Sequence, residues 1–390
     1  MRYYHQNTLL LGVLVVALLA VRDRVVQIVA AILLVLCLTR QIVHRKYNCF
    51  RMHLLAADDI NECLVMEGLV AGKSCLLMID TGYAGPPVLS MSYLSLDDED
   101  DDVKVRYTRI MKRLRKGVSA EDQNRGVDEF IRRSGCMAYT SGCTMRLMGI
   151  GSTQEQQADM LMCDMLQLRT ASGSYGSPKR ATSNAHADVF VTNPLPSSVH
   201  IITCDFLLHS SPSLLEISSN TLRLNMSVQE EVVCKAGMTM LPMVLSGGSF
   251  VVDLILGGVS FKCTVDTGSP GPICLSSRAA ARLTRCNQNR EGRVLRQSGV
   301  NGEDICSEIV SASLEFCHKT FQDVPIFAND MNTDQVDGYV GLAVLRAFDI
   351  LITPAGIGFR PNRHEMLTVD AFRSAAAVGS CPGVTLSCEA

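Results

Sequence analysis

Residues 80–90 read DTGYAGPPVLS, and residues 266–276 read DTGSPGPICLS. Seven of these eleven positions are identical, and the two copies align without a gap. Each copy directly follows an apolar, strand-like stretch, residues 75–79 (CLLMI) in one case and residues 261–265 (FKCTV) in the other. A motif repeated about one domain length apart indicates two homologous halves, each presenting an Asp-Thr-Gly turn at the end of a strand.

A second, looser repeat follows later in each half. Residues 201–208 (IITCDFLL) precede the strand-like residues 213–217, and residues 339–345 (YVGLAVL) precede the strand-like residues 348–352. Both copies consist of an apolar pair, a small residue and an apolar run. The second repeat therefore supports two halves of the same construction.

Composition sets the outer limits on function. The chain has 390 residues and a formal net charge of −3, so one large or two medium domains are expected, and nucleic acid is not an expected partner. The sixteen cysteines are scattered without zinc-ligand spacing, so a structural metal is not expected. No cofactor is predicted. Cys75 and Cys263 lie in strand-like stretches typical of buried thiols. Reduced cysteines are favoured, and a disulfide framework is the alternative.

The N-terminal part of the chain is strongly apolar. Residues 8–21 and 25–39 are apolar runs separated by Arg22-Asp23-Arg24. Each run is shorter than the ~20 residues of a spanning helix, and charges at mid-membrane cost about 2.5–3.5 kcal/mol each. We therefore expect a membrane segment within residues 1–45, contacting lipid through residues 8–43 as two short legs or one span. The alternative is a secretory signal peptide cleaved after Ala20.

Basic residues follow the apolar runs and predict the side on which the rest of the chain lies. These residues are Arg40, His44, Arg45, Lys46 and Arg51. Since positive charge accumulates on the cytoplasmic side, the following domain is expected to face the cytoplasm or the interior of a particle. A lumenal location is the alternative.

The two Asp-Thr-Gly motifs and the apolar-apolar-Gly element at residues 339–341 resemble those of the pepsin-like and retropepsin-like aspartic peptidases. The resemblance covers roughly residues 60–362. It implies an all-β, bilobal pepsin-like fold made of two retropepsin-like lobes, with an N-terminal helical membrane anchor added in this chain. The lobes would occupy residues 46–230, including a charged insert at 97–126, and residues 231–362. The tail, residues 363–390, is expected to lie beyond the fold.

The resemblance implies a membrane-anchored aspartic endopeptidase in which Asp80 and Asp266 hydrolyse peptide bonds. Two adjacent carboxylates oppose each other's ionisation, so the pair would share one proton and activate a water molecule between them. A polypeptide substrate would bind as an added strand. Since one chain carries both aspartates, the active site is expected to be complete in a monomer.

Supporting roles follow from the same resemblance. Thr81 and Thr267 would form hydrogen bonds across the lobes. Gly82 and Gly268 would let backbone amides approach the carboxylates, and Ser269 fits the small-residue pattern of the family.

Two residues depart from the family pattern. Thr203 stands where the apolar-apolar-Gly element has glycine, which predicts a distorted turn, and Tyr83 stands where the family carries a small residue. These departures keep open a catalytically weak peptide-binding module as the alternative, and a zymogen is a third possibility.

A flap over the cleft is also predicted. Residues 137–142 read as a strand entering a turn, with Tyr139 as the flap tyrosine, and residues 298–302 form the corresponding turn in the second half. An ordinary hairpin tyrosine is the alternative for Tyr139.

The insert begins with six acids, DDEDDD at residues 97–102, and residues 104–116 contain seven Lys or Arg. Apolar residues at helical spacing accompany the basic residues: Val103, Tyr107, Ile110, Met111 and Leu114. This amphipathic helix either lies on an anionic membrane or is a solvated surface insertion, and the second alternative is favoured because charge runs are usually solvated.

Overall fold

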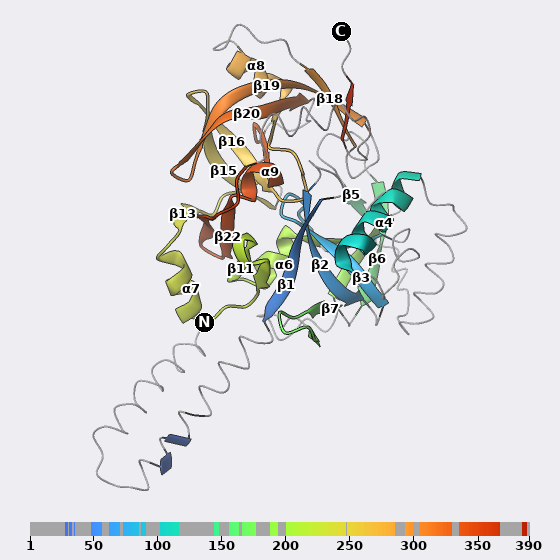
Figure 1. Ribbon diagram of the computed structural model, residues 1–390, viewed down its shortest axis with the longest axis vertical. Coiled ribbons are helices and arrows are strands. Elements are labelled where there is room, and N and C mark those ends of the chain that lie inside the picture. Colours follow the sequence, from blue (N-terminus) through green and yellow to red (C-terminus); the bar gives the residue numbers. More distant parts are fainter. Residues whose placement is uncertain are drawn as a thin grey trace.

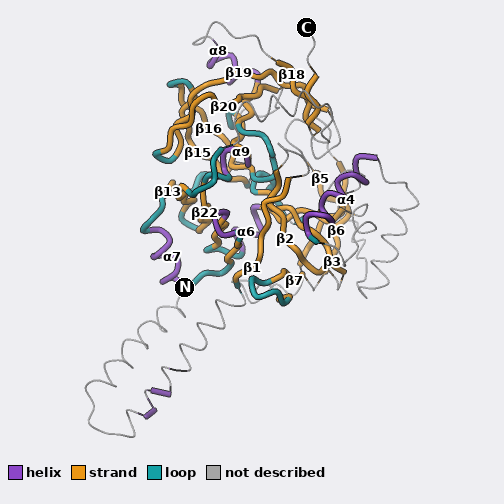
Figure 2. The backbone as a smooth tube through the Cα atoms, viewed as in Figure 1, coloured by secondary structure: helices purple, strands orange, loops and turns teal. Residues whose placement is uncertain are grey.

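The computed structural model describes part of the 390-residue chain, and strands dominate this part (Figure 2). The described residues are 28–29, 31–32, 35, 48–56, 62–70, 73–85, 87–90, 102–116, 144–147, 156–163, 166–176, 188–193, 200–246, 248–284, 293–298, 304–329, 335–366 and 384–387. The prediction of a mostly β protein is confirmed for these residues. Residues 48–230 are called the first half below, and residues 231–366 the second half.

Twelve strands are described in the first half: β1 (Cys49–Ala56), β2 (Glu62–Val70), β3 (Lys73–Asp80), β4 (Val88–Ser90), β5 (Thr144–Leu147), β6 (Gln156–Cys163), β7 (Leu166–Arg169), β8 (Tyr175–Gly176), β9 (Asp188–Asn193), β10 (His200–Thr203), β11 (Ser213–Glu216) and β12 (Thr221–Arg223). Its described helices are α4 (Val103–Lys116), α6 (Cys204–His209) and the 3₁₀ helix η1 (Ile217–Ser219), and α7 (Val228–Lys235) runs from the first half into the second.

The rest of the described chain adds β13 (Thr239–Pro242), β14 (Leu245–Ser246), β15 (Ser249–Leu256), β16 (Val259–Asp266), β17 (Ile273–Ser276), β18 (Arg293–Ser298), β19 (Asp304–Phe316), β20 (Lys319–Asn329), β21 (Gly338–Gly341), β22 (Phe348–Thr353), β23 (Gly356–Pro361) and β24 (Val384–Ser387). Its described helices are α8 (Ser277–Thr284) and α9 (Leu342–Leu345).

The two halves repeat one arrangement of strands around the Asp-Thr-Gly turns. In the first half, β3 runs parallel to β10, which pairs with β4 in the antiparallel direction and leads into α6. In the second half, β16 runs parallel to β21, which pairs with β17 in the antiparallel direction and leads into α9. The looser sequence repeat therefore corresponds to the strand and helix that lie beside each Asp-Thr-Gly strand.

Strands from both halves join in one sheet. β11 of the first half pairs antiparallel with β22 of the second, with Leu214 opposite Leu351 and Leu215 opposite Ile350. This part of the sheet has the order β13-β23-β22-β11-β12-β1, so each half contributes three neighbouring strands. Figure 1 shows β11 and β22 side by side below the yellow-to-red strands of the second half. A single cluster of buried apolar side chains also contains residues of both halves.

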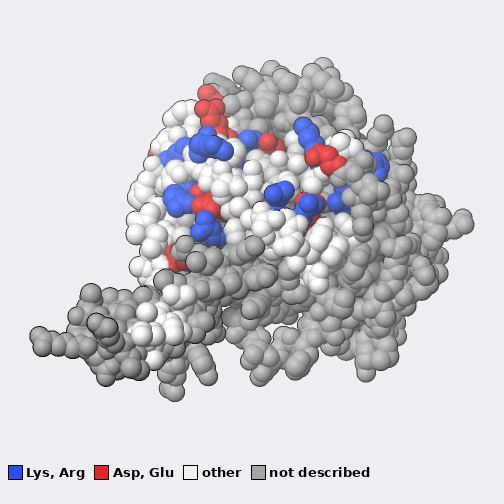
Figure 3. All heavy atoms as spheres, turned by 60° about the horizontal axis from the view of Figure 1, so that its bottom comes forward, with Lys and Arg blue, Asp and Glu red and all other residues white. Residues whose placement is uncertain are grey.

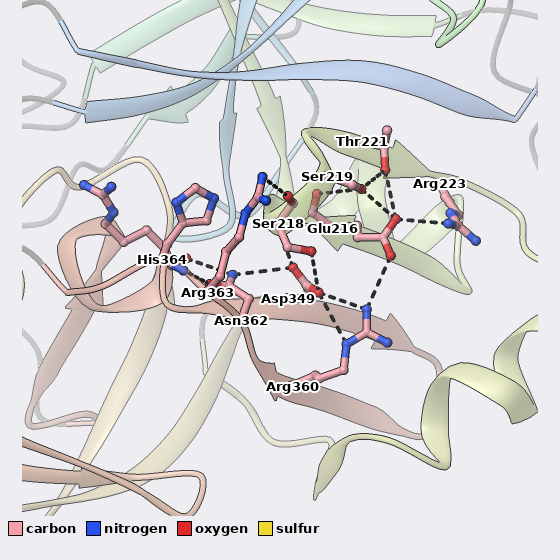
Figure 4. A network of polar contacts seen from close by, with 11 residues as sticks. Glu216, Ser218, Ser219, Thr221, Arg223, Asp349, Arg360, Asn362, Arg363 and His364 are labelled. Atoms are coloured by element: carbon pink, nitrogen blue, oxygen red, sulfur yellow. Dashed lines mark hydrogen bonds and ion pairs between the residues drawn. The ribbon is translucent and has the colours of Figure 1, made fainter.

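Arg360 forms ion pairs with residues of both halves near the place where β11 and β22 pair (Figure 4). Its guanidinium donates to the buried Asp349 of its own half at 2.9 Å and lies 3.4 Å from Glu216 of the first half. Asp349 also accepts hydrogen bonds from the amide and hydroxyl of Ser218, at 2.9 and 3.0 Å. Burial by itself raises the pKa of Glu216, but its hydroxyl partners and Arg223 hold that pKa below the ordinary value.

Helix α4, in the charged insert, packs its apolar side against the first half. Tyr107 and Ile110 are 3% and 1% exposed and belong to the main apolar cluster. Arg106 donates a hydrogen bond of 3.0 Å to the hydroxyl of Ser74 on β3. The predicted helix is therefore present, but these residues contact protein. Neither the membrane-surface alternative nor a fully solvated insertion describes that side of α4.

The N-terminal apolar runs lie largely outside the described residues. Ile28, Val29, Ile32 and Val35 are helical and at least half exposed, between 50% and 60%. Among the residues that can be placed, no helix is both long enough and apolar enough to cross a membrane.

Part of the tail is not separate from the fold, contrary to expectation. Val384–Ser387 forms β24, which pairs antiparallel with β18, and Met366 packs against the main apolar cluster. Backbone hydrogen bonding to an existing sheet edge is the physical reason, because β18 would otherwise leave that edge unpaired.

Buried thiols and mixed surface charges agree with the composition. Cys75 and Cys263 are fully buried thiols, as predicted. Burial, with a smaller effect from Asp205, raises the pKa of the Cys204 thiol to about 12. On the face shown in Figure 3, the Lys and Arg side chains lie interspersed with Asp and Glu side chains, so the described part of this face has no large field of one sign.

Candidate active site

Asp80 and Asp266 are the last residues of two equivalent strands, β3 and β16. Their side chains meet in a hydrogen bond between the two carboxyl groups, although 186 positions separate them in the chain. Both residues are nearly buried, at 6% and 7% exposed. The fold therefore brings together the two carboxyl groups that the sequence analysis singled out.

Each carboxylate is held by the backbone of its own turn. Asp80 Oδ1 accepts hydrogen bonds from the amides of Gly82 and Tyr83, at 2.8 and 3.1 Å. Asp266 Oδ1 accepts the equivalent pair from Gly268 and Ser269, at 2.9 and 3.0 Å. These amides favour the charged form of one oxygen on each side, and they fix the orientation of the carboxylates.

The two threonines of the motifs hold the turns against each other. Thr81 Oγ1 donates to the carbonyl of Val265 at 2.8 Å and accepts from the amide of Thr267 at 3.1 Å. Thr267 Oγ1 donates to the carbonyl of Ile79 at 2.8 Å and accepts from the amide of Thr81 at 3.1 Å. Four buried hydrogen bonds therefore connect the strands that end in the two aspartates.

The two glycines lie against the opposite carboxylates. A Cβ atom on Gly82 would lie 2.4 Å from Cγ of Asp266, and a Cβ atom on Gly268 would lie 2.4 Å from Cγ of Asp80. No side chain fits in either place, so glycine is required here for close approach.

The electrostatics of the pair favour retention of one proton. Burial, followed by the charge of Asp80, raises the pKa of Asp266 well above its ordinary value. Burial also raises the pKa of Asp80, while the hydrogen bonds from Asp266, Gly82 and Tyr83 act against that rise. Because the groups interact so closely, the proton belongs to the pair rather than to either residue.

The turn containing Thr203 is not distorted, so that expectation was wrong. Thr203 pairs with Asp80 as Gly341 pairs with Asp266. The backbone angles are similar, with φ −98° and ψ 169° at Thr203 and φ −102° and ψ −176° at Gly341. The Thr203 hydroxyl accepts from the amide of Phe206 at 3.3 Å, which caps α6.

The loop after the first Asp-Thr-Gly turn provides space for the Thr203 side chain. A Cβ atom on Gly341 would lie 2.1 Å from the carbonyl oxygen of Gly271. At the corresponding position in the first half, the carbonyl oxygen of Gly85 accepts a 2.6 Å hydrogen bond from the Thr203 hydroxyl, and Gly85 adopts a φ of 125°. The difference between the halves therefore lies in the loop facing Thr203, where glycine permits a positive φ.

Tyr83, the other departure from the family pattern, lies beside Asp80. It is half-buried, its amide binds Asp80, and its carbonyl accepts from the amide of Cys204 at 3.0 Å. Burial, together with the charges of Asp80 and Asp205, raises the pKa of the Tyr83 phenol to about 12. The phenol therefore stays protonated next to the carboxyl pair.

Two further residues at the site, Ser249 and Tyr339, were not predicted from the sequence. The hydroxyl of Ser249, in the second half, donates to the carbonyl of Gly82 at 2.8 Å, and no local sequence signal indicated this contact. The phenol of Tyr339 is buried and hydrogen-bonded to Ser269 and Cys274. Tyr339 was classed as an apolar member of its motif, although a tyrosine directly before a buried turn could have suggested a polar partner.

The predicted flap residues lie outside the described part of the chain. This applies to Tyr139 and to residues 299–302, so neither flap is placed. β18 and β19 pair in the antiparallel direction, with Ser298 opposite Asp304. No group of three His, Cys, Asp or Glu residues suited to a metal ion occurs among the residues that are placed.

Similarity to known proteins is found among solved structures. No family model matches the chain, and no curated protein matches it. Among solved structures, it is similar to a retropepsin-like aspartic protease from Rickettsia conorii, with 18% identity, a TM-score of 0.23, and coverage of 32% of this chain and 90% of that one. The EIAV protease in complex with the inhibitor HBY-793 gives 13% identity, a TM-score of 0.20, and coverage of 26% of this chain and 92% of the other.

Proposed function

We propose that the chain is an aspartic endopeptidase with two pepsin-like lobes, residues 46–230 and 231–362. The observation that carries the proposal is the reciprocal arrangement of the two Asp-Thr-Gly turns. Each turn holds its own aspartate with two amides, presses its glycine against the opposite aspartate, and exchanges threonine hydrogen bonds with the opposite strand. An arrangement built only for stability would gain little from burying two carboxyl groups against each other.

The proposed reaction uses the proton shared by Asp80 and Asp266. The ionised carboxylate takes a proton from a water molecule held between the two groups, and the oxygen of that water attacks the scissile carbonyl carbon. The protonated carboxyl donates its proton to the carbonyl oxygen as the tetrahedral intermediate forms. The carboxyl group that took the proton from water then gives it to the departing amine as the C–N bond breaks. One hydroxyl of the tetrahedral intermediate loses its proton to the other carboxylate as the C=O bond re-forms, which returns the pair to one proton.

A polypeptide is the proposed substrate, bound in extended form so that its backbone adds to the strands around the site. Both aspartates come from one chain, so we propose that the monomer is active. Anchoring through residues 8–43, with the peptidase on the cytoplasmic or particle-interior side, is a separate part of this proposal. It rests on the apolar runs and the basic residues that follow them.

Cleavage of a random peptide pool by the full chain in detergent, from about pH 3 to pH 8, tests the proposal. Asp80→Asn and Asp266→Asn are each expected to abolish cleavage. Asp253→Asn, a matched change at an exposed aspartate, is expected to leave it unchanged. A statine-type inhibitor is expected to block the wild-type activity. If the folded wild type cleaves no peptide at any pH but still binds peptides, the peptide-binding module replaces the enzyme.

A further inference from the structure

A second candidate site lies at the far end of the strand that carries Asp80. A hollow of about 540 Å³ is bounded by β1, β2, the first turn of α4 and the β7–β8 hairpin. Ser74 lines it, and six positions along β3 separate Ser74 from Asp80, which is about 20 Å at 3.3 Å per residue. The volume is within the range of small-molecule sites, and the hollow is separate from the proposed active site.

Basic side chains from separate elements gather around this hollow. Four Lys or Arg residues and two carboxylates line it: Arg51, Lys104, Arg106, Arg169, Glu67 and Asp102. Asp102 accepts a 2.9 Å hydrogen bond from the amide of Lys104, at the start of α4. The cations outnumber the carboxylates, so the lining has a net positive charge.

Glu67, which lines the hollow, is surrounded by basic groups. It is 2% exposed, and its Oε2 atom lies 2.6 Å from Nη1 of Arg169 and 3.7 Å from Nη1 of Arg106. His53 Nε2 lies 3.5 Å from Oε1. Burial alone raises the pKa of Glu67, but its contacts with His53 and Arg169 hold it below the ordinary value. These two partners therefore outweigh the effect of burial on Glu67.

Arg169 and His53 at this site each have one buried nitrogen without a hydrogen-bond partner within the described part of the chain. Arg169 Nε is buried and makes no hydrogen bond there, although Nη1 of the same guanidinium binds Glu67. The guanidinium also lies over the ring of Tyr175, 6.0 Å from its centroid. The Arg169 side chain is 35% exposed, so an anion can reach a guanidinium that is held in place by one carboxylate and one ring.

We propose that this hollow binds a phosphate-bearing ligand. The phosphoryl oxygens would lie among Arg51, Lys104 and Arg169, and the non-ionic part of the ligand against Leu55 and Leu69. A multiply charged group with several terminal oxygens matches three cationic side chains from three elements better than a single carboxylate does. A soluble phosphate ester and a phosphoinositide headgroup share this chemistry.

Titration calorimetry of the full chain in detergent, at constant ionic strength, tests the proposal with pyrophosphate and inositol 1,4,5-trisphosphate as probes. The double variant Arg51→Gln/Lys104→Gln changes exposed residues at the rim and leaves the Glu67–Arg169 pair in place. The double variant Lys262→Gln/Arg278→Gln removes the same charge from exposed positions in the second half. We expect saturable binding that weakens at least about tenfold in the rim variant and less than about twofold in the control.

Flotation with phosphatidylcholine vesicles, with and without phosphatidylinositol bisphosphate, separates the two ligand sources. Recruitment that requires both the lipid and the two rim cations assigns a headgroup, whereas trisphosphate binding without such recruitment assigns a soluble ester. The proposal is overturned if neither probe binds saturably and no lipid-dependent flotation occurs, or if the control variant loses as much binding as the rim variant. None of these measurements depends on peptidase activity, so their outcome is independent of the proposed function.

Discussion

Thr81 and Thr267 are hydrogen-bonded to each other's turns, each hydroxyl accepting the other's amide at 3.1 Å. Each hydroxyl also donates, at 2.8 Å, to the carbonyl directly before the opposite aspartate. Both threonines are fully buried, so these bonds are shielded from water. The spacing of the two aspartates is thus coupled to the contact between the halves of the molecule.

Replacing Thr267 by valine is expected to lower the free energy of unfolding by about 2–4 kcal/mol, because a buried amide and a buried carbonyl both lose their partner. Thr267→Ser keeps the hydroxyl and removes one methyl group, so a loss of about 1 kcal/mol is expected. Urea unfolding of the three proteins measures the difference. Equal damage from serine and valine would show that packing, rather than the hydrogen bonds, makes Thr267 important.

Gly268→Ala is expected to reduce peptide cleavage by about 100-fold or more, because the added Cβ atom would lie 2.4 Å from Cγ of Asp80 and must displace that carboxylate. Gly237→Ala is the control, since its Cβ atom would meet only Cδ of Arg360 at 3.8 Å. Steady-state cleavage rates, with circular dichroism as a check on folding, test this prediction. It fails if Gly268→Ala retains the activity of the Gly237→Ala control.

The carboxyl pair is expected to destabilise the fold as the pH rises. The pKa of Asp266 is raised above its ordinary value of 3.8, so its protonated form is favoured in the folded state. The contribution of protonated Asp266 to the stability of the folded state is fully present below about pH 3.8, and it is lost as the pH rises through the raised pKa.

Asp266→Asn should therefore be inactive but more stable than the wild type at neutral pH, and this advantage should vanish below about pH 3.8. Thermal unfolding of both proteins across pH tests the difference, with Asp253→Asn as the exposed control. A neutral-pH stability equal to or lower than that of the wild type would contradict the prediction.

Glu216 is expected to give the opposite pH dependence. Its pKa is held below the ordinary value of 4.5. The contribution of ionised Glu216 to the stability of the folded state is therefore present above about pH 4.5 and is lost as the pH falls through the lowered pKa. Glu216→Gln should lower the free energy of unfolding by about 1 kcal/mol at neutral pH. The effect is this small because Arg223 and Arg360 are both more than a third exposed, at 38% and 35%, so water screens their ion pairs with Glu216.

The cost of Glu216→Gln should shrink on acidification. Glu231→Gln, which breaks only the helix-surface pair with Lys235, should change stability by less than about 0.5 kcal/mol. Urea unfolding at neutral and acidic pH measures both effects. A cost of Glu216→Gln that does not depend on pH would rule out an ionised Glu216 as the cause.

Thr203 and Gly341 occupy equivalent positions, but we expect them to respond differently to substitution. Thr203→Gly removes the cap of α6 and the hydrogen bond to Gly85, with an expected loss of about 1–2 kcal/mol. Gly341→Ala would place a Cβ atom 2.1 Å from a backbone oxygen, with an expected loss of at least about 3 kcal/mol. Unfolding midpoints of the two variants compare them, and similar losses would refute the inferred difference between the facing loops.

Sequence reasoning succeeded where the signal was local and present twice. Asp80 and Asp266 each follow an apolar run that forms a strand, so the repeat placed both residues at strand ends without knowledge of the fold. The prediction of a distorted turn at Thr203 was wrong because the partner of Thr203, Gly85, lies 118 positions away. A departure from the family motif at Thr203 carries no information about the loop that faces this residue.

In the charged insert, too, the sequence predicted local structure but not packing. Its helical periodicity correctly predicted a helix, but not the surface against which its apolar side packs. That surface includes Ser74, which binds Arg106 across 32 positions of sequence. Periodicity indicates that a face is apolar, and only the tertiary arrangement determines what covers it.

By itself, the sequence determined that the chain contains two copies of one strand-turn unit, since residues adjacent in sequence specify strand, turn and glycine positions. The tertiary structure decided how the copies meet: which amides bind each carboxylate, how Thr81 and Thr267 cross between the halves, and where Arg360 joins Glu216 to Asp349. The reason is that these contacts join residues far apart in the chain, up to 188 positions for Thr267 and Ile79. Their geometry depends on the packing of the whole molecule, which local sequence patterns do not encode.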